Sequence, residues 1–233
     1  MIRNLGRKFR CRKLENARGI LIDMIKKADS SCSKAIENMI ESKEIDVNEK
    51  CTEREGLSIF LAACLSGNKE LIRYTLHKKG DIWSTTNSGD PPFYLATHGI
   101  LTSSVLDLSV LNELLEAGCH INSCNAFGYT ALHRAAAVGN MQVIDWLLEH
   151  NANPSIMNAR GILPCDSAFI NSHFEASEKL RLSAKNYDRW ITAKNIKSSK
   201  KNTLERFPID IKMDENILME RNASGDNNES MAY

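Results

Sequence analysis

The residues of this sequence best suited to metal binding or nucleophilic chemistry are its seven cysteines and six histidines. They are scattered along the chain, with no Cys-x-x-Cys pair and no Cys/His group at the spacing of a zinc site. The residues in question are Cys11, Cys32, Cys51, Cys64, Cys119, Cys124 and Cys165, with His77, His98, His120, His133, His150 and His173. The helical pattern turns Cys64 and Cys165 inward, so we expect them to be inert core thiols rather than nucleophiles. The sequence therefore predicts no catalytic residue, no metal and no cofactor.

Motifs of catalysis and nucleotide binding are also missing from the chain. It holds no Gly-x-Gly-x-x-Gly, no Walker loop, no Gly-x-Ser-x-Gly and no His-Glu-x-x-His. The balance of 30 Lys and Arg against 29 Asp and Glu gives no overall field that would attract nucleic acid or a membrane. We therefore expect a protein that is not an enzyme and has no small-molecule substrate, no direct nucleic-acid ligand and no membrane partner.

Targeting signals bear on the expected compartment. No run approaches the roughly 18 apolar residues of a membrane-spanning helix, and the N-terminus lacks the apolar core of a secretion signal. Scattered cysteines fit reduced thiols inside the cell. We expect the protein in the cytoplasm, or in the nucleus. The first 27 residues are Arg-rich with two acidic residues, which leaves a mitochondrial transit peptide as an alternative.

Four segments that begin with glycine recur along the chain and indicate an internal repeat. They read GLSIFLAACLSGN from Gly56, GDPPFYLATHG from Gly89, GYTALHRAAAVGN from Gly128 and GILPCDSAF from Gly161. Two of the three intervals are 33 residues and the middle one is 39. A period of 33 residues with one six-residue insertion resembles the ankyrin-repeat family.

The third copy, residues 128–160, carries the pattern most fully. Apolar residues fall on one face of each of two short helices, which are separated by Gly139-Asn140. Thr130 is placed to cap the first helix. The resemblance implies that His133 hydrogen-bonds backbone between repeats rather than acting chemically. At the ends of the second helices, Gly80, Gly118 and Asn151 are expected to take the left-handed conformation.

The fold class predicted is all-α, an ankyrin-repeat solenoid of helix-turn-helix repeats with short hairpin tips, flanked by disordered tails. We expect a basic N-terminal arm at 1–16, an array at 17–190 and a mostly disordered tail at 191–233. Within the array we expect a divergent capping repeat at 17–50 and repeats at 56–88, 89–127, 128–160 and 161–190. Nothing stacks on the last repeat, so its outer face should be polar, with Glu175, Glu178, Lys179 and Arg181.

Residues 207–219 hold too many apolar side chains for a simple linker. Three interpretations are open: a strand or turn that packs on the last repeat, a segment similar to the F-box-like ends of some viral ankyrin proteins, or a linear motif for an unknown partner. The six-residue insertion, within residues 99–109, either lengthens a helix or forms a loop that carries partner specificity.

The resemblance implies that function lies on the concave face, made of the hairpin tips and the exposed side of each first helix. The partner-binding residues predicted are Trp83, Phe127, Tyr129, Arg134 and Arg160. Trp83 stands where the family usually has Asn, and exposed aromatic side chains are typical of binding hot spots. The alternative for Trp83 is packing against the neighbouring hairpin.

The function expected from this resemblance is that of a protein-interaction adaptor or inhibitor, which binds a partner protein of unknown identity. The alternative is a substrate-recruiting adaptor for ubiquitin ligation, or a host-directed pathogen or viral protein, that acts through residues 207–219.

Overall fold

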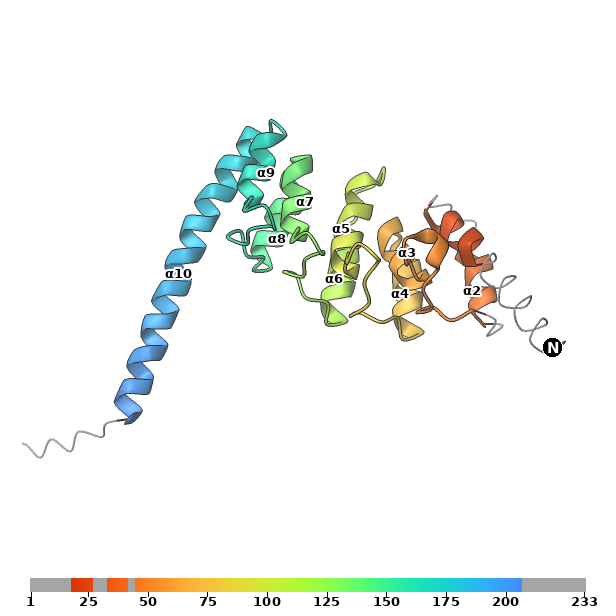
Figure 1. Ribbon diagram of the computed structural model, residues 1–233, viewed down its shortest axis with the longest axis horizontal. Coiled ribbons are helices and arrows are strands. Elements are labelled where there is room, and N and C mark those ends of the chain that lie inside the picture. Colours follow the sequence, from red (N-terminus) through yellow and green to blue (C-terminus); the bar gives the residue numbers. More distant parts are fainter. Residues whose placement is uncertain (1–17, 27–32, 42–44, 207–233) are drawn as a thin grey trace, which may run out of the picture. The chain divides into compact units, whose positions relative to one another are not determined.

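The structure is a computed structural model that describes residues 18–26, 33–41 and 45–206 (Figure 1). The chain divides into two compact units, 1–189 and 190–233. In the described ranges the regular structure is helical, with two isolated bridges, Cys51–Leu57 and Cys124–Thr130, in place of strands. The expected basic arm at 1–16 and the apolar segment 207–219 lie outside the described residues.

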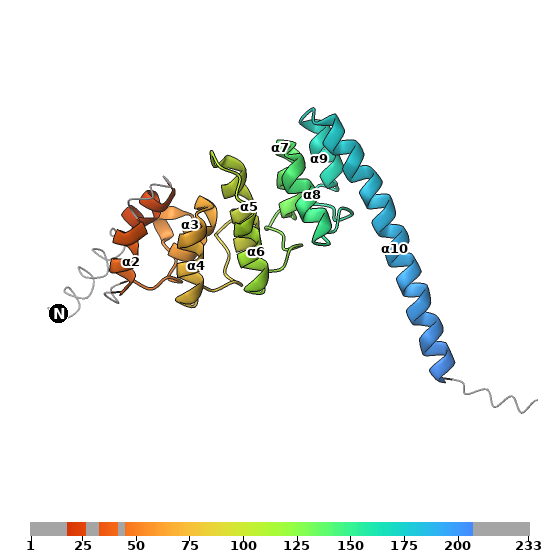
Figure 2. The same cartoon turned by 180° about the vertical axis from the view of Figure 1, so that it is seen from behind.

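The first unit is a series of helix pairs, which Figures 1 and 2 show side by side. A helix over 18–26 precedes α2 (Ser33–Glu41) and the short 3₁₀ helix η2 (Thr52–Arg54). The pairs are α3 (Ile59–Ser66) with α4 (Lys69–His77), α5 (Pro92–Thr102) with α6 (Ser109–Glu116), and α7 (Ala131–Val138) with α8 (Met141–Glu149). In the last pair, α9 (Pro164–Ile170) is followed by α10 (Phe174–Arg206), of which residues 174–189 belong to this unit. The first helices of the pairs form one row, because α3 packs on α5, α5 on α7 and α7 on α9.

Glycine and asparagine make the turn inside two of the pairs. Gly67 and Gly139 take the left-handed conformation, with φ of 67° and 71°. The next residue then caps the second helix: Asn68 Oδ1 accepts from Leu71 N at 3.1 Å, and Asn140 Oδ1 accepts from Val143 N at 3.0 Å. The left-handed turn ends one helix and the amide cap starts the next, so the dipeptide reverses the chain.

The ends of the second helices correct one prediction. The left-handed residues are Lys79, Gly118 and Asn151, with φ of 65°, 97° and 65°. The prediction that Gly80 takes this conformation is wrong. Glycine is needed there for space, since a Cβ on Gly80 would lie 2.6 Å from Cδ2 of Phe60.

The insertion both lengthens a helix and adds a loop. Helix α5 has 11 residues where α3 and α7 have 8, and residues 103–108 then lead into α6. The glycine turn of the α3–α4 and α7–α8 pairs is lost here, and Gly99 lies inside α5. A Cβ on Gly99 would be 2.5 Å from the carbonyl oxygen of Leu65, so the missing side chain permits the close approach of α3 and α5.

The last pair differs from the expected polar cap. Glu175, Glu178 and Arg181 are exposed as predicted, but so are large apolar side chains, among them Phe169 at 61%, Ile170 at 66% and Phe174 at 62%. The helical backbone of α10 also continues through 191–206, where we expected a disordered tail. The physical reason is that no glycine or proline occurs between Phe174 and Pro208, and Lys, Arg, Glu and Leu are good helix formers.

Candidate partner-binding surface

The hairpin tips between helix pairs are joined to one another through backbone hydrogen bonds. Asn87 N donates to Glu55 O at 2.8 Å, Ala126 N to Ser88 O at 3.2 Å, and Ala159 N to Phe127 O at 2.9 Å. Each tip therefore holds the next one. The four tips form a single hydrogen-bonded edge of the first unit, rather than independent loops.

His133 has a structural role, as predicted. Its Nε2 donates to the carbonyl of Ile162 in the next helix pair at 3.0 Å, so Nδ1 is the acceptor for Thr130 N at 3.2 Å. Burial lowers the pKa of His133, and the hydrogen bond to Ile162 opposes that shift. The ring therefore acts as a neutral link that caps α7 and binds the next repeat.

A polar cluster lies on the row of first helices, and we call Tyr94, His98, Tyr129 and Arg134 the inner-helix cluster. Arg134 Nη2 lies 3.1 Å from Nδ1 of His98 and donates a hydrogen bond to it. The pKa of His98 is lowered, mainly by burial and next by Arg134. Burial raises the pKa of Tyr94, Arg134 opposes this and Tyr129 adds to it. Residues from α5, α7 and the third hairpin therefore meet at one place.

Arg134 lacks an acidic partner in this cluster. Within the described ranges, none of the ion pairs includes Arg134, and its Nε atom is buried with no hydrogen-bond partner. The carboxylate of Asp90 is already engaged, since it accepts from Thr86 Oγ1 of its own hairpin and from Asn125 Nδ2 of the next hairpin, both at 3.0 Å. A guanidinium with free donors in a half-buried setting is able to bind a carboxylate.

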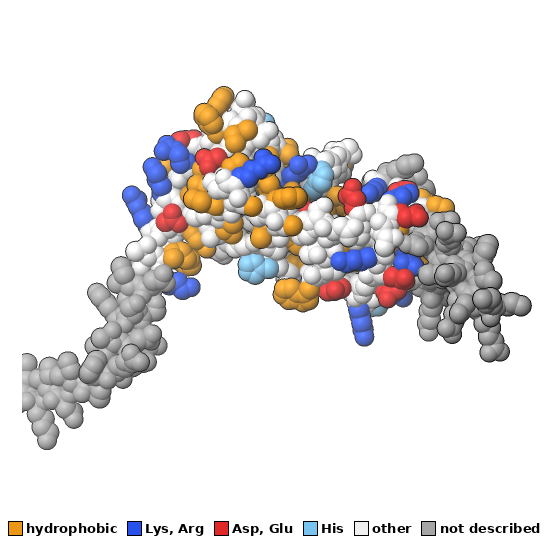
Figure 3. Space-filling model, in the orientation of Figure 1, with side chains coloured by type: hydrophobic (Ala, Val, Ile, Leu, Met, Phe, Trp, Pro, Cys, Tyr) orange, Lys and Arg blue, Asp and Glu red, His pale blue; other side chains and the backbone are white. Residues whose placement is uncertain are grey.

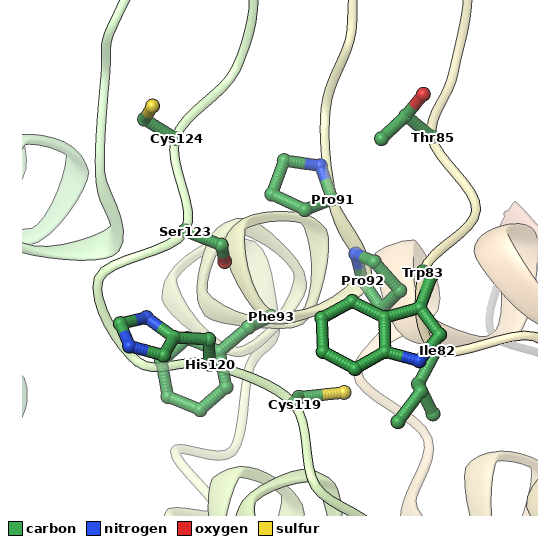
Figure 4. Close-up of a pocket in the computed structure, with 10 residues that line it drawn as sticks. All are labelled: Ile82, Trp83, Thr85, Pro91, Pro92, Phe93, Cys119, His120, Ser123 and Cys124. Carbon is green, nitrogen blue, oxygen red and sulfur yellow. The ribbon is translucent and has the colours of Figure 1, made fainter.

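A second feature is a pocket of about 200 Å³ between the hairpin bases of two neighbouring repeats (Figure 4). Trp83 forms one wall and is 76% exposed overall. Figure 4 shows its indole beside Pro92, with Phe93, His120 and Ser123 around the opposite side. Burial raises the pKa of Cys119, whose thiol also lines the pocket, to about 12, so this thiol stays neutral.

The structure brings some of the predicted binding residues together and separates others. Tyr129 and Arg134 both lie near Tyr94 in the inner-helix cluster, whereas Trp83 lines the pocket. Phe127 is 60% exposed and Arg160 is exposed, each at a hairpin tip. Tyr129 is half-buried, with its ring edge-on to His133 at 5.6 Å between centroids.

Sequence reasoning missed four residues of these two places: Tyr94, His98, His120 and Ser123. Tyr94 could have been found, because it occupies the motif position that His133 occupies in the third repeat. His98 is four residues later, one helical turn along the same face. His120 and Ser123 carry no signal of their own, since their importance depends on the residue at position 83.

The visible surface shows no field of one sign. On the face in Figure 3, Lys and Arg side chains alternate with Asp and Glu side chains, and hydrophobic side chains lie exposed between them. The described residues contain no group of three His, Cys, Asp or Glu side chains that could hold a metal ion. Among the helices of the described ranges, none is long and apolar enough to cross a membrane.

Stacked helix pairs, left-handed turns and linked hairpin tips define a helical-repeat solenoid. Residues 100–189 match the family model for ankyrin repeats, described as three copies. Residues 100–189 are thus ankyrin repeats, and the predicted fold class is confirmed. Proteins of this family are typically scaffolds without catalytic activity, and ankyrin repeats are general modules of protein–protein interaction.

Relatives of known name share the repeat region with this chain. It is 28% identical over 117 residues to the ankyrin repeat-containing protein F37A4.4 of Caenorhabditis elegans. This match covers 47% of this chain and 10% of that protein. It is 38% identical over 78 residues to the potassium channel AKT1 of Oryza sativa subsp. indica, and the match covers 34% of this chain and 8% of the channel. Mouse Synphilin-1 is 25% identical over 166 residues, and the match covers 71% of this chain and 17% of Synphilin-1. The chain thus spans a small part of each relative's length.

Proposed function

We propose that this protein is an adaptor or inhibitor that binds an acidic segment of a partner protein at the inner-helix cluster. The observation that carries the proposal is Arg134, whose guanidinium has the ring of His98 as a neighbour, a buried Nε without a partner, and no ion pair within the described ranges. A carboxylate from a partner would accept hydrogen bonds from the two Nη groups at once.

The neighbouring side chains support the same mode of binding. His98 is neutral near pH 7, because burial and Arg134 both lower its pKa, so it leaves one positive charge in the cluster rather than two. Tyr94 and Tyr129 add ring surface and hydroxyl groups that contact a peptide at low cost in side-chain entropy. The family resemblance contributes the general expectation of a protein partner.

Affinity purification with quantitative mass spectrometry tests the proposal. The full chain is compared with Arg134→Gln, which removes the charge but keeps a hydrogen-bonding side chain. Arg73→Gln is the matched control, since Arg73 is exposed and already paired with Glu113 on α6. We expect a set of proteins that the wild type and Arg73→Gln enrich and that Arg134→Gln loses, with capture weaker at high salt.

The result that would contradict the proposal is capture by Arg134→Gln at the wild-type level. Thermal unfolding of the three proteins checks that the two variants are folded. A melting temperature of Arg134→Gln within a few degrees of the wild type assigns the loss of capture to the surface and not to the fold.

A further inference from the structure

Asparagine side chains link successive repeats at the bases of their hairpins. Asn48 Oδ1 accepts from the backbone N–H of Asp81 at 2.8 Å, and Asn122 Oδ1 accepts from that of Asn153 at 2.8 Å. In both cases the amide joins one loop to the first residue of the corresponding loop in the next repeat. The position between these two asparagines in the repeat order is Trp83.

Trp83 breaks this series of links. An indole has one donor and no acceptor, so it cannot receive a hydrogen bond from the backbone N–H of His120, which corresponds to Asp81 and Asn153. The hydroxyl of Ser123, three residues later, is buried and has no hydrogen-bond partner. Both residues line the pocket described above, so two donors there lack the protein acceptors that their position in the fold would suggest.

The rest of the pocket is apolar and uncharged. Its walls include the indole of Trp83 and the rings of Pro92 and Phe93, and its lining contains no Lys, Arg, Asp or Glu. Its volume of about 200 Å³ exceeds the roughly 150 Å³ of an engineered cavity that binds benzene. The pocket thus has room for one large aliphatic or aromatic side chain.

We propose that this pocket binds a peptide segment of a partner protein, taking one uncharged apolar side chain between Trp83 and Phe93. A carbonyl oxygen of the same segment accepts from His120 N–H and Ser123 Oγ–H. The peptide thereby supplies the acceptor that an asparagine supplies in the neighbouring repeats. The inference deepens the proposed function by adding an anchor that is separate from Arg134 and selects a different residue type.

Capped amino acids test the pocket without knowledge of the partner. N-acetyl-phenylalanine amide and N-acetyl-leucine amide carry both the side chain and the carbonyl, whereas N-acetyl-alanine amide carries the carbonyl alone. Each is titrated into the ¹⁵N-labelled full chain, and the Trp83 indole and His120 backbone amide resonances are followed. We expect the first two to bind with a Kd of about 1 mM, as suits a fragment, and the alanine probe at least about tenfold more weakly.

Two variants make the test specific. Trp83→Asn should weaken binding of the phenylalanine probe at least about tenfold and raise the melting temperature above that of Trp83→Ala, because it restores the link to His120. Ser123→Ala should weaken binding about threefold to tenfold, the worth of one hydrogen bond. Because Trp83 is 76% exposed, we expect Trp83→Asn to keep the fold, and its melting temperature checks that a loss of binding is not a consequence of unfolding.

The proposal is overturned if the phenylalanine and leucine probes leave the His120 amide unshifted at 20-fold the expected Kd of about 1 mM. It is equally overturned if Trp83→Asn binds the probe as the wild type does. Arg134→Gln should bind the probe unchanged, so failure of the pocket leaves the inner-helix cluster untested by this experiment, and the purification with Arg134→Gln judges the proposed function separately.

Discussion

At the residue scale, equivalent positions of the repeats perform different tasks. The motif position of His133 is held by Tyr94 in the preceding repeat and by Asp166 in the next one. His133 links α7 to the following repeat, Asp166 accepts from Leu163 N at 3.0 Å and caps α9, and Tyr94 contributes to the inner-helix cluster. At this motif position His133 therefore stabilises the fold, whereas the equivalent Tyr94 on α5 is available for binding.

Buried His133 and half-buried His98 predict how stability changes with pH. The pKa values of His98 and His133 are lowered in the folded state, mainly by burial, below the ordinary histidine value of about 6.5. The unfolded chain therefore binds protons more readily, so the stabilisation is present above about pH 6.5 and is lost as the pH falls through the folded pKa values. We expect the free energy of unfolding to fall by at most about 1.4 kcal/mol per pH unit per histidine.

Urea unfolding between pH 7.5 and pH 5 measures this effect. His133→Asn should reduce the slope, since one neutral buried imidazole is removed, and His98→Asn should do the same by relieving its contact with Arg134. A pH slope that both variants leave unchanged would show that other groups dominate the acid sensitivity, and the assignment to these two rings would be wrong.

The sequence predicted a residue's role correctly where its position in the repeat determines that role, and wrongly where contacts with other repeats determine it. The period identifies Thr130 and His133, because a helix cap and its neighbour depend on local geometry. It places the left-handed residue at Gly80 instead of Lys79, because the close contact of Gly80 with Phe60 depends on packing. It also gives no sign that Arg134 lies beside His98, 36 residues away across an insertion.

At the element scale, packing within one helix pair predicts a clear separation of core and tip substitutions. Leu147 on α8 is fully buried, and its replacement by Ala should lower the free energy of unfolding by about 2 to 4 kcal/mol through loss of transfer energy and the cavity left behind. Arg160→Ala and Glu53→Ala, at exposed tips, should change it by about 0.5 kcal/mol or less. Urea unfolding with a common m-value makes the comparison. Tip variants as destabilised as Leu147→Ala would show that the faces are assigned wrongly.

The length of elements was harder to predict than their order. Two short amphipathic patterns about a Gly-Asn turn specify a helix pair, so α3 with α4 and α7 with α8 were foreseeable. The extra residues after His98 could extend a helix or form a loop, and they do both. The continuation of α10 to Arg206 follows from the absence of glycine and proline in this segment. We expected disorder there because the segment is highly polar.

At the scale of the whole molecule, the core has a definite end. The buried apolar residues of the described chain run from Leu21 to Ala184, and Lys179 and Asp188 tie the start of α10 to Asp145 and Ser155. A solenoid is stabilised by contacts between neighbours, so loss of a piece beyond the last buried residue costs little, whereas loss of a helix that covers the previous one costs that interface.

Two truncations follow from this boundary. A chain that ends at residue 189 keeps every described core residue, and we expect its melting temperature to stay within a few degrees of that of the full chain, with less helical signal because part of α10 is gone. A chain that ends at residue 163 loses α9 and α10, uncovers Ala135 and Ala136 of α7, and should aggregate on purification. Circular dichroism and size-exclusion chromatography with light scattering distinguish the two. If the chain ending at 189 melts more than about 10 °C below the full chain, residues 190–233 contribute to the core after all, because such a shift corresponds to the loss of a substantial interface.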